Sequence, residues 1–452
     1  MLSKIAVLLM SPASPSAILL YGMVFGFAMW TYLGWPWLRS DTIILYLATS
    51  VWAMAVIVRR WRAVGFSLNR LDILFCAFLF VVLGSVATHW WEGTVKYLEF
   101  MPCFFVLPFL LGRMMGGEDV SLFKKILIGL GGVLLLLMPV EYWRNSQPGL
   151  IYVNSPVPIL FSQGHGTMIS GHILSATLLS LVSMLIVPAA STMDASGDER
   201  RYRSLGYMIL ALIAVVMVWI SSRGAAVAAV LGMMTLFLVS SYCGWKKKIA
   251  LLFYVSLFVF VAALYSFQNV YHKEHYLALL QRPAVTLDVE REGATSQARQ
   301  LEYGKPILGE ESCKNILGSV SDHWIHYKSA WEIFLAKPWS GVGANFYGFY
   351  SCTGPGWYPH STILQVLAEL GIMGGLVYFS MIGMLFYALI ARYLSSVAVC
   401  AKATMGWALA FVVLQLMISQ FSGNYFMSAG LYFGVGLAAS FLDGAEKKPR
   451  LA

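Results

Sequence analysis

Charged residues are scarce in this chain. Only 12% of its 452 residues are Asp, Glu, Lys or Arg, and 59% are hydrophobic, whereas soluble domains have about 25% charged residues. Apolar runs near 20 residues, the length that crosses a hydrocarbon core of about 30 Å, recur along the sequence. No sustained alternation of the outer-membrane barrel kind is present. The sequence therefore predicts an all-α polytopic membrane protein and excludes an ordinary soluble domain.

Further absences restrict the function. A Walker-type motif is missing, so we expect no direct use of ATP. Carboxylates within the apolar runs are few, with Glu99 and Glu141 near their ends, which disfavours an ion- or proton-coupled transporter. Metal-dependent membrane glycosyltransferases place an acidic pair in the first outer loop, but residues 35–41 contain only Asp41. Since no Cys/His spacing is typical of zinc either, we expect no metal or other cofactor.

Twelve apolar stretches are candidate spans. They cover approximately residues 16–35, 42–58, 71–88, 96–113, 124–143, 167–189, 205–221, 223–242, 249–268, 371–393, 403–420 and 425–442. The seventh and eighth are divided at residues 221–224, because Arg223 at the centre of one longer span would cost at least a few kcal/mol.

The distribution of basic residues predicts the orientation. If both termini are inside, nineteen Lys and Arg residues lie in inner loops and tails and four lie in short outer loops. This bias places both termini in the cytoplasm, and no cleaved signal pattern is expected. Because the basic residues cluster between apolar runs, the net charge of +9 reflects topology and not a nucleic-acid partner.

The spans divide the chain into three parts. Residues 1–268 contain spans one to nine, residues 269–359 form one large outer loop, and residues 360–452 contain an interfacial helix, three spans and a cytoplasmic tail. Loops of this length are functional or disordered. A helical pattern over residues 321–336 indicates order in this one. Cys313 and Cys352 are the two cysteines expected outside, and we predict that they form a disulfide.

His360 is the first candidate for chemistry. It follows Pro359 at the start of a helical pattern, where unpaired N–H groups and the positive end of the helix dipole favour a neutral imidazole. A neutral histidine can act as a general base. The alternative is a loop histidine that binds backbone. Since residues 361–393 are too many for one span, we expect the first ten or so to lie at the membrane interface.

Several other side chains could bind a substrate. Arg223 lies in an apolar context at the outer surface, where its planar guanidinium suits phosphate oxygens, although it could also extend toward lipid headgroups. The segment with His323, His326 and Tyr327 could contact sugars or phosphate, or it could pack on the membrane. Two arginines of the large loop could reach a diphosphate or be simply solvated: Arg291 and Arg299.

Three segments together resemble the O-antigen ligase/polymerase superfamily. They are the pair Ser222-Arg223, the sequence KPWSGVG at 337–343 and the sequence HSTILQVLAELGIMG at 360–374. Members of the superfamily commonly show an SR motif, an hPxxGvG motif and an HNxxLxxxxExGxxG motif. The resemblance is densest over residues 321–375.

The resemblance implies a metal-independent, inverting glycosyltransferase related to the C-type membrane fold. Its donor would be a glycan on undecaprenyl pyrophosphate. In the ligase branch the acceptor is a hydroxyl of the lipid A–core oligosaccharide, and the reaction takes place on the periplasmic side of the bacterial inner membrane. By the same resemblance, His360 would activate the acceptor hydroxyl and Arg223 would hold the pyrophosphate.

The sequence departs from the family pattern in two places. Ser361 stands where the family usually has Asn, and this residue could affect how the imidazole is oriented. His323 and Tyr327 stand where the family often has Arg and Trp, so a direct arginine–phosphate assignment does not transfer to His323. Arg291 or Arg299 could take that role.

Three functions are open. Polymerases often have two large arginine-rich outer loops, and this chain has one, which favours an O-antigen ligase. The alternatives are an O-antigen or exopolysaccharide polymerase or a protein O-oligosaccharyltransferase of the same superfamily. A transporter of lipid-linked glycan is a third possibility, but it would not depend on a single histidine.

Overall fold

The described part of the chain is helical. The computed structural model describes residues 8–17, 19, 41–65, 67–90, 98, 101–145, 223–239, 323–351, 358–422, 424–426 and 428–446, and no strand is found among them. The main helices are α3 (Asp41–Val64), α4 (Arg70–Thr88), η2 (Pro102–Val106), α6 (Leu107–Arg113), α7 (Gly117–Asn145), α10 (Arg223–Val239), α14 (His323–Ala336), α15 (Tyr347–Tyr350), α16 (Thr362–Ser395), α17 (Val399–Ser422) and α18 (Ala429–Glu446).

Several helices are apolar enough to cross a membrane. Within the described ranges, three also have the necessary length: Arg70–Thr88, Thr362–Ser395 and Ala401–Phe421. Shorter apolar helices cover Pro102–Arg113, Val227–Val239 and Ala429–Asp443. The chain is therefore a multi-pass membrane protein, as the sequence predicts. All or most of four other expected spans lies outside the described residues: 16–35, 167–189, 205–221 and 249–268.

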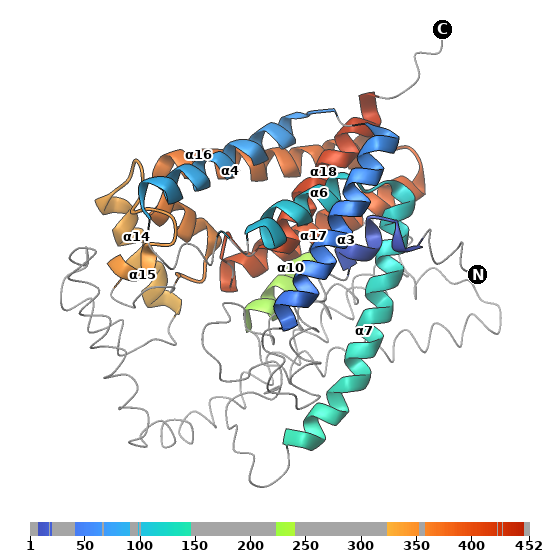
Figure 1. Cartoon of the computed structure of the whole chain (residues 1–452), viewed down its shortest axis with the longest axis horizontal. Coiled ribbons are helices and arrows are strands. Elements are labelled where there is room, and N and C mark those ends of the chain that lie inside the picture. Colours follow the sequence, from blue (N-terminus) through green and yellow to red (C-terminus); the bar gives the residue numbers. More distant parts are fainter. Residues whose placement is uncertain are drawn as a thin grey trace.

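The long helix α16 organises the arrangement. It packs against α4, α14, α17 and α18, while α10 packs on α17 and α6 packs on α18. In Figure 1, α4 and α16 run together, with α14 and α15 at their left-hand end. The beginning of α4 and the end of α18 lie at the opposite end. The described helices thus have two distinct ends.

Aromatic side chains and glycines bring α4, α6 and α18 close together. The rings of Phe75 and Phe109 stack with centroids 3.7 Å apart. A Cβ at Gly112 would lie 2.8 Å from the backbone nitrogen of Leu437, and one at Gly436 would lie 2.9 Å from that of Arg113. Small residues that let backbones approach are typical of helix contacts in membranes. The α6–α18 contact therefore requires glycine on both helices.

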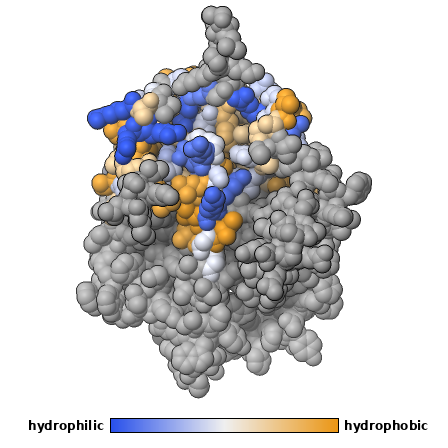
Figure 2. Space-filling model, turned by 90° about the vertical axis from the view of Figure 1, so that its right-hand side faces the viewer, coloured by the Kyte–Doolittle hydropathy of each residue, from blue (hydrophilic) through white to orange (hydrophobic). Residues whose placement is uncertain are grey.

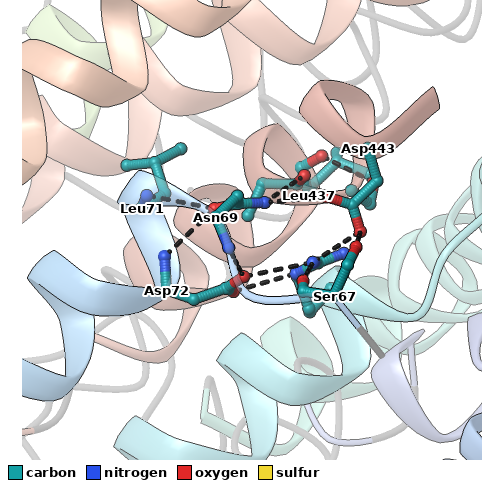
Figure 3. A network of polar contacts seen from close by, with 9 residues as sticks. Ser67, Asn69, Leu71, Asp72, Leu437 and Asp443 are labelled. Carbon is teal, nitrogen blue, oxygen red and sulfur yellow. Dashed lines mark hydrogen bonds and ion pairs between the residues drawn. The ribbon is translucent and has the colours of Figure 1, made fainter. Parts of the chain in front are cut away.

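A buried arginine joins three elements at the end opposite α14. Arg113 Nε donates to Asp72 Oδ1 at 2.8 Å, and its Nη2 lies 2.6 Å from Asp443 Oδ2. The same Nη2 donates to the Ser67 carbonyl at 2.6 Å, and Asn69 Nδ2 donates to Asp443 Oδ1 at 3.1 Å. Figure 3 labels Ser67, Asn69, Asp72 and Asp443 of this network, and we call these four residues together with Arg113 the Arg113 cluster. They bind the loop before α4 to the ends of α6 and α18.

The same end contains other basic residues that the sequence assigns to the inner side. Arg70 begins α4 beside the Arg113 cluster, and Arg392 Nε donates to the carbonyl of Phe441 in α18 at 2.8 Å. Figure 2 shows the adjoining side of the molecule, where hydrophilic residues gather above a band of hydrophobic ones. Residues predicted to share one side of the membrane therefore share one end of the helices.

Candidate functional site

A break in α16 accommodates the loop that precedes it. Gly371 has φ 62° and ψ −161°, which are not helical. In an unbroken helix, the N–H groups of Ile372 and Met373 would bond to the carbonyls of Ala368 and Glu369, four residues earlier. They donate instead to the carbonyls of Pro338 and Trp339, at 2.7 and 3.4 Å. The break thus leaves two helical carbonyls without their usual donors.

The same loop supplies donors to those two carbonyls. Val342 N–H donates to the carbonyl of Ala368 at 3.0 Å, and Gly343 N–H donates to that of Glu369 at 2.9 Å. All four backbone groups released by the break are therefore paired, as buried backbone groups must be. We refer to this exchange between loop 338–343 and helix α16 as the α16 break.

Glycine is required on both sides of the α16 break. Gly341 has φ 68°, and a Cβ there would collide with the backbone of Glu369. A Cβ at Gly371 would lie 2.5 Å from the carbonyl of Trp339. Both backbone conformations lie in the region that glycine adopts readily. The glycines of the two sequence motifs therefore make one contact between them.

The carboxylate of Glu369 fixes the chain beyond this contact. It is fully buried and accepts hydrogen bonds from the N–H groups of Asn345 at 2.8 Å and Tyr347 at 3.3 Å. The hydroxyl of Tyr425 donates to it at 2.9 Å, and Gln365 Nε2 donates at 3.4 Å. Glu369 thereby binds the start of α15 and the segment before α18 to one point on α16.

His360 lies immediately before the cap of α16. Ser361 is the N-cap residue, and its hydroxyl accepts from Leu364 N–H at 3.4 Å and donates to Gln420 Oε1 at 3.0 Å. Gln420 Oε1 also accepts from Ile363 N–H at 3.1 Å. The serine at this position in the motif is therefore engaged in capping the helix and binding α17.

Two imidazoles and two phenols gather at the start of α16. The ring of His360 lies 4.6 Å from that of Tyr358 and 5.7 Å from that of His326, between centroids. His326 is 1% exposed, and its Nδ1 lies 3.4 Å from the hydroxyl of Tyr347. We call these four residues the His360 cluster. It combines a residue from α14, one from α15 and two from the segment before α16.

The Tyr347 hydroxyl joins the side chain and the backbone of His326. It donates to the backbone carbonyl of His326 at 3.2 Å and lies within hydrogen-bond distance of the Nδ1 atom, at 3.4 Å. Burial raises the pKa of both the Tyr347 and Tyr358 phenols, which keeps them neutral near pH 7.

The backbone of the cluster is unusual. Among the described residues other than glycine, Asn345 and His360 have positive φ, at 65° and 57°. Such conformations cost about 1–3 kcal/mol each and concentrate at functional sites. Both residues lie in segments attached to the start of α16, one of them beside Glu369 and the other in the His360 cluster. The two positive-φ residues other than glycine in the described ranges thus lie in loops that contact the first part of α16.

Comparison with known families accounts for this arrangement. The family model of the O-antigen ligase matches residues 208–379. This range includes Arg223, both sides of the α16 break and the whole His360 cluster. This match supports an assignment to the O-antigen ligase superfamily over that part of the chain. No curated protein matches the sequence.

The other site residues expected from the sequence have different positions. Tyr327 donates its hydroxyl to the carbonyl of Gln420 at 3.1 Å, so it binds α14 to the end of α17 that Ser361 also contacts. His323 is the first residue of α14. Four expected residues lie outside the described ranges: Arg291, Arg299, Cys313 and Cys352.

Arg223 is the first residue of α10 that the structure describes, and residues 221–222 before it lie outside the described ranges. At the other end of α10, the carbonyl of Val239 accepts from the hydroxyl of Tyr393, near the end of α16. Helix α10 packs on α17, whose last turn contacts the start of α16 through Gln420. Helix α10 therefore runs with its Arg223 end toward the end of α16 where His360 lies.

Proposed function

We propose that this chain is an O-antigen ligase, which transfers a glycan from undecaprenyl pyrophosphate to a hydroxyl of lipid A–core. The observation that supports this most is the His360 cluster at the strained start of α16, within the region matched by the family model. The reaction belongs at the periplasmic face of the inner membrane, with both chain termini in the cytoplasm. The basic residues gathered around the Arg113 cluster, at the opposite end of the helices, support this orientation.

In the proposed reaction, His360 is the general base. It accepts the proton of the acceptor hydroxyl while that oxygen attacks the anomeric carbon of the donor. The new C–O bond forms as the bond between the anomeric carbon and the pyrophosphate oxygen breaks, and undecaprenyl pyrophosphate leaves with the bonding electrons. Because the attack is a single displacement, the anomeric configuration inverts.

Arg223 would stabilise the leaving pyrophosphate. A guanidinium can bind two phosphate oxygens at once, and it keeps its positive charge in an apolar environment better than lysine does. Arginine can therefore neutralise the developing charge without a divalent cation.

A reconstituted transfer assay tests the proposal. Purified protein is mixed with undecaprenyl-pyrophosphate glycan and lipid A–core, and we expect a joined product on a gel. A second reaction omits lipid A–core. If longer glycans form in the reaction without lipid A–core, and no joined product forms in the reaction with it, the protein is a polymerase of the superfamily and not a ligase. A chelator added to the first reaction should leave the rate unchanged, and inhibition would contradict the metal-independent mechanism.

A further inference from the structure

Helix α14 has two different faces. Ala330 and Ile333 are fully buried against the neighbouring elements, on the same side as His326. On the opposite side, Trp324 is 72% exposed and Trp331 is 46% exposed. The exposed side chains recur at the spacing of one helical face. Large aromatic side chains exposed on one face of a helix mark a surface that contacts a membrane or another protein.

The exposed face continues into the lipid-facing side of α16. Trp339, which follows α14, is 71% exposed, and its carbonyl accepts from the N–H of Met373. Met373 begins a stripe of exposed apolar residues along α16, which ends near Leu394. From Met373 to Leu394 the helix rises about 32 Å at 1.5 Å per residue, which matches the hydrocarbon thickness of about 30 Å. Trp339 therefore lies at the edge of the hydrocarbon layer.

We propose that Trp324, Trp331, Leu335 and Trp339 form a membrane-binding face that lies in the interfacial layer of the phospholipid bilayer. Tryptophan prefers this depth, because its ring is apolar and its indole N–H can reach water or headgroups. Lys328 is exposed on this same face, one turn from both Trp324 and Trp331, and it pairs with Glu332 at 3.8 Å. Its long side chain can extend so that the ammonium group reaches the phosphates. Continuity with the spanning helix favours lipid over a protein partner.

The membrane-binding face would determine the depth of the His360 cluster relative to the bilayer, and this depth does not depend on which glycan is transferred. His326 is on the side of α14 opposite the membrane-binding face, so the cluster lies across one helix from the lipid headgroups. Substrates attached to lipids present their reacting groups at this level. The face would therefore hold the site level with the headgroups, whichever acceptor is used.

Spin labels test the position of the face. Trp331→p-acetylphenylalanine and Trp339→p-acetylphenylalanine allow a nitroxide to be attached without changing the cysteines, and Glu332→p-acetylphenylalanine is the control, about 100° around the helix from 331. The labelled proteins are reconstituted in phosphatidylcholine–phosphatidylglycerol vesicles. We expect a higher ratio of oxygen to nickel-complex collisions at 331 and 339 than at 332. Equal ratios, or labels shielded from both reagents by other protein segments, would overturn the proposal.

A second measurement uses the unmodified protein, in case a labelled variant does not insert. Vesicles contain a phospholipid with a diazirine near the glycerol end of its acyl chain, and adducts are mapped by mass spectrometry after illumination. We expect adducts on the peptide that contains Trp331 and Leu335 as well as on the Met373 region of α16. Adducts on α16 with none on α14 would refute the membrane-binding face.

Discussion

The backbone at His360 allows the general-base role to be tested without unfolding the site. Its φ of 57° lies in the left-handed region, which Asn tolerates better than most residues do. We expect His360→Asn to keep the fold and to lose transfer activity by about 10²–10⁴-fold, the usual contribution of a general base. The initial rate of ligation in the reconstituted assay measures the loss, and thermal unfolding in detergent serves as the control. Near-normal transfer by a folded His360→Asn protein would exclude His360 as the base.

Arg223 should contribute through both its charge and its shape. Arg223→Lys keeps the charge but loses the planar fork, whereas Arg223→Ala loses both. We therefore expect kcat/KM for the donor to fall in the order Arg, Lys, Ala, with a total loss of about 10²–10³-fold for Ala. Measurements at several donor concentrations give this order. If Arg223→Ala retains the wild-type kcat/KM, the arginine does not hold the pyrophosphate.

The sequence could identify His360 because its signal is local: a histidine after Pro359 at the start of an apolar helix. The sequence named His326 as a candidate for binding a substrate, but it could not place this residue beside His360, since that contact depends on which side of α14 faces α16. Glu369 shows the same limit. It belongs to a recognisable motif, but its hydrogen-bond donors Asn345, Tyr347 and Tyr425 come from separate segments. Only the tertiary structure brings them to one carboxylate.

At the level of elements, the α16 break should be the most sensitive feature. Gly371→Ala would place a Cβ against the carbonyl of Trp339 and impose a positive φ on alanine, which costs about 1–3 kcal/mol before any collision. Gly383→Ala is the matched control, because it lies in the same helix with open space around its Cβ position. We expect the first substitution to lower the unfolding temperature and the transfer rate, and the second to leave both nearly unchanged. Similar unfolding temperatures for the two variants would show that the break tolerates a side chain.

The spans themselves could be predicted from apolar runs alone. The expected spans 71–88 and 403–420 correspond to Arg70–Thr88 and Ala401–Phe421. The excess length of the region that starts at residue 361 also led to the expectation of an interfacial first part, and α16 is broken at Gly371. Hydropathy could not show what fills the break, because the partner is a loop whose backbone, and not its side chains, makes the contact.

At the level of the whole molecule, the two ends of the helices have different roles. One end holds the His360 cluster and the strained backbone, and the other holds the Arg113 cluster. The sequence assigned Arg113 only to the inner side of the membrane. Its ion pairs with Asp72 and Asp443 join residues far apart in the chain, and no local pattern relates them. The side of the membrane on which Arg113 lies could thus be predicted from the sequence. Its role in joining separate segments of the chain is seen only in the structure.

The Arg113 cluster should therefore determine stability without affecting chemistry. Removing one partner of a buried ion pair leaves an uncompensated charge and costs about 3–5 kcal/mol. Arg113→Met leaves the buried Asp72 and the partly buried Asp443 unpaired, whereas Arg62→Met changes an exposed arginine in the last turn of α3 and should cost no more than about 0.5 kcal/mol.

Equilibrium unfolding of both variants in mixed detergent measures the difference, and transfer rates well below the unfolding transition should equal those of the wild type. Adding Asp72→Asn and Asp443→Asn to Arg113→Met should recover part of the loss, because neither carboxylate then remains buried and charged. If Arg113→Met is as stable as Arg62→Met, the cluster does not hold this end of the molecule together.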